Sequence, residues 1–266
     1  MPWVLRGLRN GIVTSRWPQG VDEYFDQFPA AVRVIGGADT GAPPRAVAAA
    51  TACPTGAISV EPQPQLDRGR CILCGRCVDL APEWFGWETG SATAGLSRAS
   101  LVVGAIEESD EALAELRAAL ANRVRRLRRS VHLRHVDTGS DGSDEWEIQA
   151  LTNPVYDLHR LGIFFTASPR HADILLVTGI GAAAMIEPLR RTLDAMPAPT
   201  VVIAVGSDAV SGGLIGSGYI GGVGVGDVVP VDVWVPGAPA SPFSVLHGIL
   251  LALGRVPRYE RTSAPC

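Results

Sequence analysis

The chain has 266 residues, which is enough for one large or two modest domains, each with a core of its own. Its 23 Lys and Arg against 27 Asp and Glu give a net charge of −4, which excludes the basic footprint of a nucleic-acid-binding protein. The start, MPWVLRGLRNG, lacks a signal-peptide core, and no apolar run reaches the roughly 18 residues that a transmembrane helix needs, so we expect neither feature.

The first half of the chain predicts little regular structure before one long helix. Residues 1 to about 50 read as irregular, and residues 51–88 hold most of the cysteines. Residues 107–130 predict a helix, with acidic residues in its first turn and arginines in its last, as the helix dipole favours. Its apolar face consists of Leu113, Leu116, Leu120, Val124 and Leu127. The five arginines between 123 and 129 either bind an acidic partner or form a solvated helix end.

The second half alternates between strand and helix patterns. We expect strands at residues 162–166, 173–179, 200–206 and 229–235, and helices at residues 153–160, 182–195 and 242–253. Short β-branched strands that alternate with helices are typical of a mainly parallel sheet covered on both faces. The glycine-rich segment SGGLIGSGYIGGVGVGD carries neither a dinucleotide nor a P-loop motif, so it does not indicate a nucleotide site.

The cysteines have the spacing of an iron–sulfur site. Cys71, Cys74 and Cys77 lie in CILCGRC, a C-x2-C-x2-C run, and Cys53 precedes Pro54 in ACPTGAI. Bacterial ferredoxins combine such a run with a remote Cys-Pro around each cluster, because four thiolates are needed for one cube. These four residues therefore predict one [4Fe-4S] cluster. A four-cysteine zinc site is the alternative, although zinc usually takes two C-x2-C pairs.

A second cluster of the ferredoxin type would need cysteines at four positions that lack them. These positions hold Pro43, Ala46, Ala49 and Ala81. We expect Trp84, Phe85 and Trp87 to shield the remaining cluster from water. The fifth cysteine, Cys266, reads as a thiol at a frayed end of the chain.

The second half contains long phrases that resemble a known family. LTNPVYDLHRLGIFFTASPRHADILLVTG, LRRTLDAMPAPTVVIAVGSDAVSGG and VPVDVWVPGAPASPFSVLHGILLAL are similar to the small electron-transfer subunit of complex I and of membrane-bound, group 4 [NiFe] hydrogenases. The resemblance covers roughly residues 132–254, and the amino-terminal half resembles the ferredoxin-like subunit of the same assemblies. It implies a fusion of two neighbouring subunits, whose second part is a flavodoxin-like domain with a [4Fe-4S] cluster of its own.

The sequence departs from the family pattern at every ligand of that second cluster. In the hydrogenase branch the ligands come from a C-x2-C loop, a G-A-C-A-type loop and a P-G-C-P loop. Here the first loop has Asp141 and Asp144 at the C-x2-C spacing, the second has Asp208, and the third has Ala238. Because carboxylates are poor ligands for iron–sulfur cubes, we expect this cluster to be lost.

Three hypotheses for the aspartates stay open. They are solvated substitutions that fill a vacated site, or Asp141, Asp144 and Asp208 bind a hard cation such as Mg²⁺, Ca²⁺ or Mn²⁺. In the third hypothesis one carboxylate handles protons, with a pKa that its neighbours raise. Arg170 and His171, in a family phrase placed near the cluster and the catalytic partner, are weaker candidates: a loop arginine in an ion pair is as plausible, and His171 is an improbable ligand.

We expect an α/β protein made of a small ferredoxin-like α+β module, residues 1–105, and a flavodoxin-like domain with a mainly parallel sheet, residues 132–256. Residues 106–131 would be a linker helix and residues 257–266 a tail. The function predicted is that of a non-catalytic electron-transfer subunit, with a structural scaffold of an ion- or proton-translocating complex as the alternative. The expected partners are a catalytic large-subunit homologue, membrane antiporter-like subunits and a ferredoxin-type electron donor, on the cytoplasmic side of the cell membrane.

Overall fold

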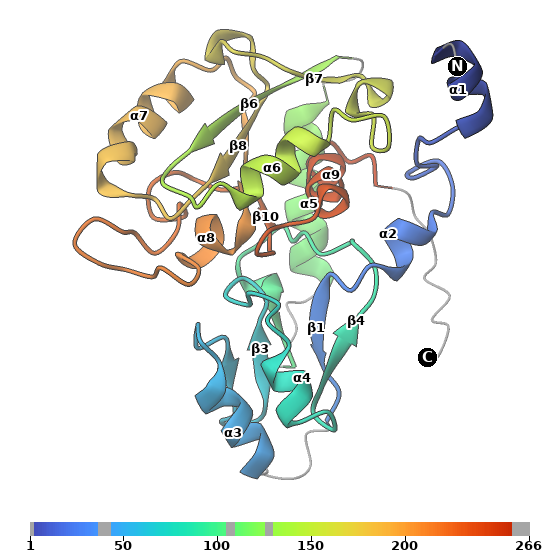
Figure 1. Ribbon diagram of the computed structural model, residues 1–266. Coiled ribbons are helices and arrows are strands. Elements are labelled where there is room, and N and C mark those ends of the chain that lie inside the picture. The colour runs from blue at the N-terminus through green and yellow to red at the C-terminus, as the bar shows by residue number, and fades with distance from the viewer. Residues whose placement is uncertain (1–2, 37–43, 105–109, 126–129, 257–266) are drawn as a thin grey trace.

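The second half of the chain is built on a five-stranded parallel sheet. The computed structural model describes residues 3–36, 44–104, 110–125 and 130–256. The strands are β6 (Val131–Asp137), β7 (Ile163–Phe165), β8 (Ile174–Thr178), β9 (Val201–Val205) and β10 (Val233–Val235). Their order across the sheet is β10-β9-β8-β6-β7, and all of them run parallel (Figure 1). This order is that of flavodoxin-like folds, and it confirms the predicted mainly parallel sheet.

The four strands predicted in this half are confirmed, but the central strand β6 was missed. Its sequence, VHLRHVD, places His132, Arg134 and His135 between apolar residues, so it lacks the continuous apolar run of the other strands. The run is interrupted because these polar side chains are only half buried, whereas every residue of β8 and β9 is buried.

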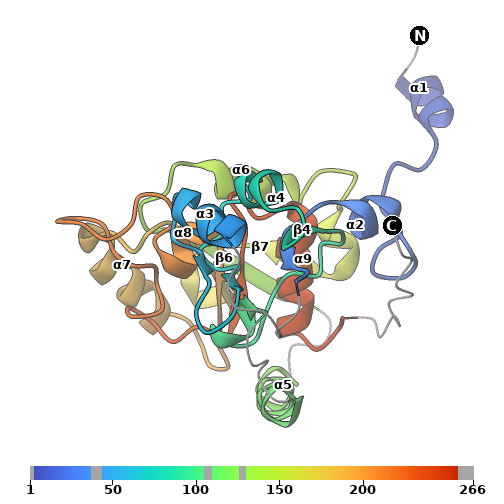
Figure 2. The same ribbon diagram turned by 90° about the horizontal axis from the view of Figure 1, so that it is seen from below.

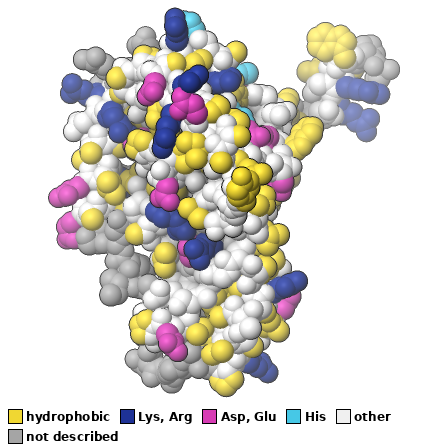
Figure 3. Space-filling model, turned by 90° about the vertical axis from the view of Figure 1, so that its left-hand side faces the viewer, with side chains coloured by type: hydrophobic (Ala, Val, Ile, Leu, Met, Phe, Trp, Pro, Cys, Tyr) yellow, Lys and Arg dark blue, Asp and Glu magenta, His cyan; other side chains and the backbone are white. Residues whose placement is uncertain are grey.

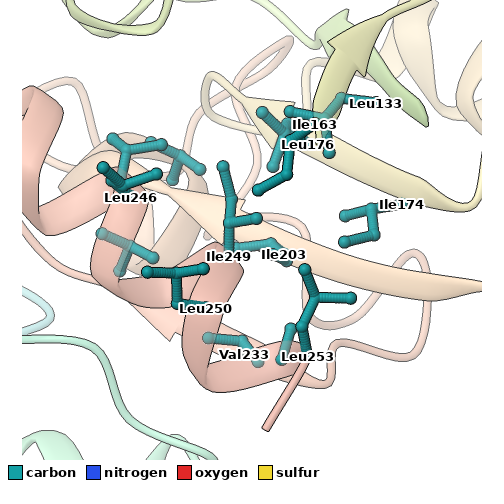
Figure 4. Packing of buried hydrophobic residues seen from close by; sticks show 14 of the residues in the cluster. Leu133, Ile163, Ile174, Leu176, Ile203, Val233, Leu246, Ile249, Leu250 and Leu253 are labelled. Atoms are coloured by element: carbon teal, nitrogen blue, oxygen red, sulfur yellow. The ribbon is translucent and has the colours of Figure 1, made fainter. Parts of the chain in front are cut away.

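Each face of the sheet is covered by helices. Helices α5 (Asp110–Val124) and α9 (Pro242–Ala252) contribute to one core, and α7 (Ala183–Asp194) and α8 (Gly206–Ser211) to the other. Successive strand residues alternate between the two cores: Leu176 belongs to the first, and Leu175 and Val177 belong to the second. Figure 4 shows side chains of α9, such as Leu246 and Ile249, beside those of the strands.

Two of the predicted helices differ from the structure. Residues 153–160 do not form a helix: the helix of this region is α6 (Ser143–Ala150), and a short 3-10 turn follows at Leu158–Leu161. The Asn153 side chain accepts from the Val155 N–H, and Pro154 has no N–H to donate, which together favour a turn. The predicted helix at residues 107–130 appears as α5, whose Leu120 and Val124 are buried while Leu116 is exposed; Leu127 lies outside the described residues.

The amino-terminal half is more regular than its sequence indicates, so the prediction of an irregular first 50 residues is wrong. It contains α1 (Trp3–Asn10), α2 (Glu23–Gln27), α3 (Pro44–Ala52) and α4 (Arg76–Leu80). Strand β1 (Ala31–Val34) pairs antiparallel with β4 (Phe85–Glu88). Strands β2 (Ile58–Ser59), β3 (Gln65–Asp67) and β5 (Val102–Val103) form a second antiparallel sheet. These elements carry the cysteines; their ferredoxin-like character and the domain boundaries stay predictions.

The two halves are in direct contact. The Trp17 ring stacks on Phe25 at 4.3 Å, and both meet Phe243 of α9 edge-on. Gly95 and Trp234 form an antiparallel bridge beside β10, and the Ser211 hydroxyl donates to the Gly69 carbonyl at 2.9 Å. No helix in the described ranges combines the length and hydrophobicity needed to cross a bilayer.

The central strands make a first prediction about stability. Leu176 is fully buried in β8, so Leu176→Ala should lower the free energy of unfolding by about 2–5 kcal/mol. The same substitution at Leu214, whose side chain is 63% exposed, should change it by less than about 0.5 kcal/mol. Urea titrations followed by circular dichroism measure both, and equal effects of the two variants would contradict the placement of the core.

Candidate functional site

The four predicted cysteine ligands line one cavity. Cys53 follows α3, Cys71 and Cys74 lie in the loop between β3 and α4, and Cys77 is on α4. All four are free thiols, and the remaining wall of the cavity is mainly apolar, with Val32, Ile58, Leu66 and Ile72 among its residues. The four cysteines that the sequence spacing predicts as ligands therefore lie around one cavity.

The backbone of the cysteine loop is curled by two residues with positive φ. Leu73 has φ 55° and Gly75 has φ 77°, the left-handed conformation that glycine adopts most easily. Gly75 also precedes the first residue of α4, so the turn leads directly into the helix that buries Cys77. The Trp87 ring lies against Gly75: a Cβ there would stand 3.3 Å from it.

Backbone N–H groups point at two of the sulfurs. The Ala57 N–H donates to the Cys53 Sγ at 3.3 Å, and the Leu73 N–H donates to the Cys71 Sγ at 3.4 Å. Burial, together with repulsion from the other three cysteines, raises the pKa of Cys71 to about 11, and burial also raises the pKa of Cys77. Both thiols are therefore neutral at pH 7 until a metal replaces their protons.

This donor set has the chemistry of an iron–sulfur site. It offers four soft sulfur ligands, amide donors that stabilise thiolates, and an apolar shell. Across the described ranges, no group of three or more His, Cys, Asp or Glu side chains is placed so that it could hold a metal ion. The fit to a cluster thus rests on donor chemistry and on the shared cavity.

The positions of the missing second ferredoxin cluster are packed with apolar side chains. Ala46 and Ala49 lie on α3 and Ala81 follows α4; all three are fully buried in one cluster with Trp84 and Phe85. The same cluster includes Cys77, so two of the three predicted shielding aromatics pack against the cysteine site, while Trp87 is partly exposed. Pro43 lies outside the described residues.

A second candidate site lies at the carboxyl ends of the parallel strands, where ligands bind in open α/β sheets. Asp144 lies in the first turn of α6, which follows β6; Gly206 begins α8 directly after β9; and Ala240 lies in the loop after β10. Asp144 is 3% exposed, and its Oδ1 accepts from the Ala240 N–H at 2.9 Å. Gly206 has φ 86°, and a Cβ there would stand 1.8 Å from the Asp144 Oδ2. The Asp144 carboxylate thus fills the space where these three segments meet.

Burial and neighbouring acids act on two of the aspartates. Burial raises the pKa of Asp144 to about 8, with a smaller contribution from the charges of Glu145, Asp208 and Asp141. Burial also raises the pKa of Asp208 to about 6. Asp141 is exposed, and its Oδ1 accepts from the Ser143 N–H and hydroxyl, which lowers its pKa.

The three aspartates therefore lie in different environments. Asp141 is a solvated residue, as the first hypothesis predicts, but Asp144 is not. The metal hypothesis gains no support, because no cation-holding group is formed within the ranges that the structure describes. The raised pKa of Asp144 agrees with the proton-handling hypothesis, although burial and not the neighbouring charges is its main cause.

A hydrogen-bonded network next to Asp144 was not predicted. The Thr178 hydroxyl donates to the Glu145 Oε1, and the Ser140 hydroxyl donates to its Oε2 at 2.8 Å. The His135 Nε2 lies 2.9 Å from the Thr178 hydroxyl, and burial lowers the pKa of this ring. His135 lies on β6 and Thr178 ends β8. Because β6 was not predicted, the network could not be predicted either.

The cysteine loop and the carboxylate site are neighbours. Cys71 and Leu73 share one cavity with Pro236 and Gly237 of the loop after β10. Leu73 and Trp87 share a larger cavity, of about 1010 Å³, with Ala238 and Glu147. The Gly237 carbonyl accepts from the Ser207 N–H at 2.6 Å, which ties this loop to α8.

Arg170 and His171 lie elsewhere. They are exposed on a 3-10 turn, Pro169–His171, that precedes β8, whereas the carboxylates follow the strands. The five residues of β8 separate the two ends by roughly 16 Å. The structure does not bring either residue to the site, and Cys266 lies outside the described residues.

Comparison with known proteins identifies relatives of the second half. Residues 142–252 match the family described as NADH ubiquinone oxidoreductase, 20 Kd subunit. The chain is 39% identical to formate hydrogenlyase subunit 7 of Escherichia coli over 145 residues, 54% of this chain and 56% of that protein. It is 35% identical to the probable membrane-bound hydrogenase subunit mbhJ of Pyrococcus furiosus over 150 residues, 56% of this chain and 90% of that protein. It is 40% identical to an uncharacterized protein of Methanocaldococcus jannaschii over 123 residues, 46% of this chain and 82% of that protein. The chain thus spans little more than half of the first relative and most of the other two.

The buried carboxylate predicts an unusual pH dependence. The pKa of Asp144 in the folded protein, about 8, lies above the ordinary value of 3.8, so the folded state holds a proton that the unfolded state releases. Stability that depends on this proton is lost as the pH rises towards 8. Asp144→Asn, which keeps an acceptor for Ala240, should flatten this loss and raise the free energy of unfolding at pH 8 by at least about 1 kcal/mol.

Asp141→Asn is the matched control, because it removes an exposed carboxylate whose pKa is lowered. It should give no gain at pH 8. Thermal unfolding of both variants between pH 5 and pH 9 measures the difference. Stability curves for Asp144→Asn that run parallel to those of the unaltered protein would show that Asp144 ionises normally.

Proposed function

The chain belongs to the family of the 20-kDa subunit of NADH ubiquinone oxidoreductase, and we propose that it is an electron-transfer subunit that carries one [4Fe-4S] cluster in its amino-terminal half. The observation that carries the proposal is the set of four free cysteines around one cavity, at a ferredoxin spacing. The complex would be a membrane-associated, complex-I-like or hydrogenase-related oxidoreductase. The named relatives are subunits of formate hydrogenlyase and of a membrane-bound hydrogenase.

In this proposal Cys53, Cys71, Cys74 and Cys77 hold the cluster. When bound, such a cluster accepts and returns single electrons. The chain's own residues bind it through four sulfurs, donate backbone hydrogen bonds to Cys53 and Cys71, and exclude water with the apolar shell around Cys77. Amide donors and burial are the two means by which the protein sets the potential of the cluster.

In this proposal the second half of the chain binds the other subunits of the complex. A ferredoxin-type donor would reduce the cluster, and the α/β half would bind a catalytic large-subunit homologue and antiporter-like membrane subunits on the cytoplasmic side. The closeness of the cysteine loop to residues 236–238 supports this arrangement, because it puts the cluster beside the loop that carries a ligand in the hydrogenase branch.

A scaffold role is the second candidate, and one observation favours it. Among residues 130–256 there is no cysteine, and the position of a second cluster holds the buried Asp144, bonded to Ala240. A relay that needs two clusters within this chain is therefore interrupted. Under this proposal the chain joins other subunits, and the amino-terminal cluster serves stability alone.

Metal content tests the cluster. We expect about four iron atoms and four sulfides per chain after anaerobic reconstitution, and an EPR signal after reduction. Cys74→Ser should remove most of both, since it deletes one of four ligands. Cys266→Ser, the same exchange at a cysteine that the proposal does not assign to the cluster, should leave them unchanged. Zinc in place of iron, or equal loss in both variants, would refute the proposal.

Turnover of the assembled complex separates the two candidates. An electron-transfer subunit requires its cluster, so Cys74→Ser should lower turnover at least tenfold while the complex still assembles. If the chain is only a scaffold, the assembled Cys74→Ser variant keeps full activity. Size-exclusion chromatography of both complexes shows whether assembly is intact.

A further inference from the structure

Helix α1 stands apart from the rest of the molecule. Figures 1 and 2 show it projecting beyond α2, and none of its residues is buried. Gly11, with φ 66°, follows the helix. A helix of eight residues with no buried side chain is marginal in water, so a surface that covers its apolar residues would stabilise α1.

The apolar and the polar residues of α1, WVLRGLRN, lie on two different sides of the helix. At about 100° per residue, Trp3, Val4, Leu5 and Leu8 fall within one arc of roughly 200°. Arg6, Arg9 and Asn10 fall within the remaining arc. The apolar side chains are open to solvent: Trp3 is 83% exposed and Leu8 is 76% exposed. In Figure 3 hydrophobic and basic side chains lie apart on the projecting segment.

Charge distinguishes this segment from the remainder of the chain. Residues 1–21 contain Arg6, Arg9 and Arg16 but no acidic residue, so their charge of +3 leaves −7 for the other 245 residues of a chain whose net charge is −4. An anionic surface attracts the segment and repels the body. Packing of the apolar arc into a protein groove would not by itself account for this separation of charge.

We propose that α1 is an amphipathic anchor that lies in the interface of an anionic lipid bilayer. Trp3, Leu5 and Leu8 enter the boundary between headgroups and acyl chains, and Arg6 and Arg9 contact lipid phosphates. Trp is enriched at this depth of a bilayer because its ring is amphipathic. The anchor stands independently of the proposed cluster, and it holds the chain at the membrane without a helix that crosses it.

Vesicle flotation with the full-length protein tests the anchor. We expect the protein to float with vesicles of three parts phosphatidylcholine to one part phosphatidylglycerol, and at least threefold less with phosphatidylcholine alone. Leu8→Glu and the double variant Arg6→Glu/Arg9→Glu should each reduce the floated fraction at least threefold. High salt should weaken binding of the unaltered protein, since the arginine contacts are screened.

Two control variants carry the same changes elsewhere. Leu214→Glu replaces another exposed leucine, and Arg33→Glu/Arg170→Glu reverses two other exposed arginines. Both should float like the unaltered protein, and iron content should be the same in all variants. Failure of the unaltered protein to float on anionic vesicles, or an equal loss in the controls, would overturn the proposal. If α1 variants instead impair assembly with a partner subunit while flotation is unchanged, α1 is a protein contact.

Discussion

The fold depends on a parallel sheet that must be covered on both faces. Because β8 and β9 are buried throughout, helices have to pack on each side, and every connection between the parallel strands starts at the carboxyl edge of the sheet. The segments that follow β6, β9 and β10 therefore bring Asp144, Gly206 and Ala240 together from positions far apart in the chain. The same edge borders the cysteine loop, so one constraint of the architecture places both candidate sites next to each other.

In the proposed function a carboxylate stands where a cluster ligand is expected, and this changes what the surrounding protein must do. A thiolate cluster needs soft donors, whereas the carboxylate at position 144 needs a hydrogen bond, a proton or water. Here the Ala240 N–H supplies one bond, and burial favours the protonated acid. Asp144 thus forms a buried polar contact with the loop after β10, within a domain that has the parallel sheet of the family fold.

The shared cavity of the four cysteines could be predicted from sequence because three of them lie within one short segment and the fourth is marked by the following proline. The strands β7 to β10 could be predicted because their apolar runs are continuous. Strand β6 could not, since His132, Arg134 and His135 interrupt its pattern. The burial of Asp144 also lay beyond prediction, because the N–H group that donates to its carboxylate belongs to Ala240, 96 residues away. The cysteine cavity could thus be predicted from local spacing, whereas the burial of Asp144 depends on tertiary contacts.

In the proposed function this chain carries one cluster, in its amino-terminal half, and none at the carboxyl edge of its sheet. Anomalous diffraction at the iron absorption edge, from crystals of the anaerobically purified protein, tests it most directly. We expect one four-iron peak among Cys53, Cys71, Cys74 and Cys77, and no peak near Asp144. Iron density beside Asp144 and Asp208, or a single-atom peak among the cysteines, would contradict it.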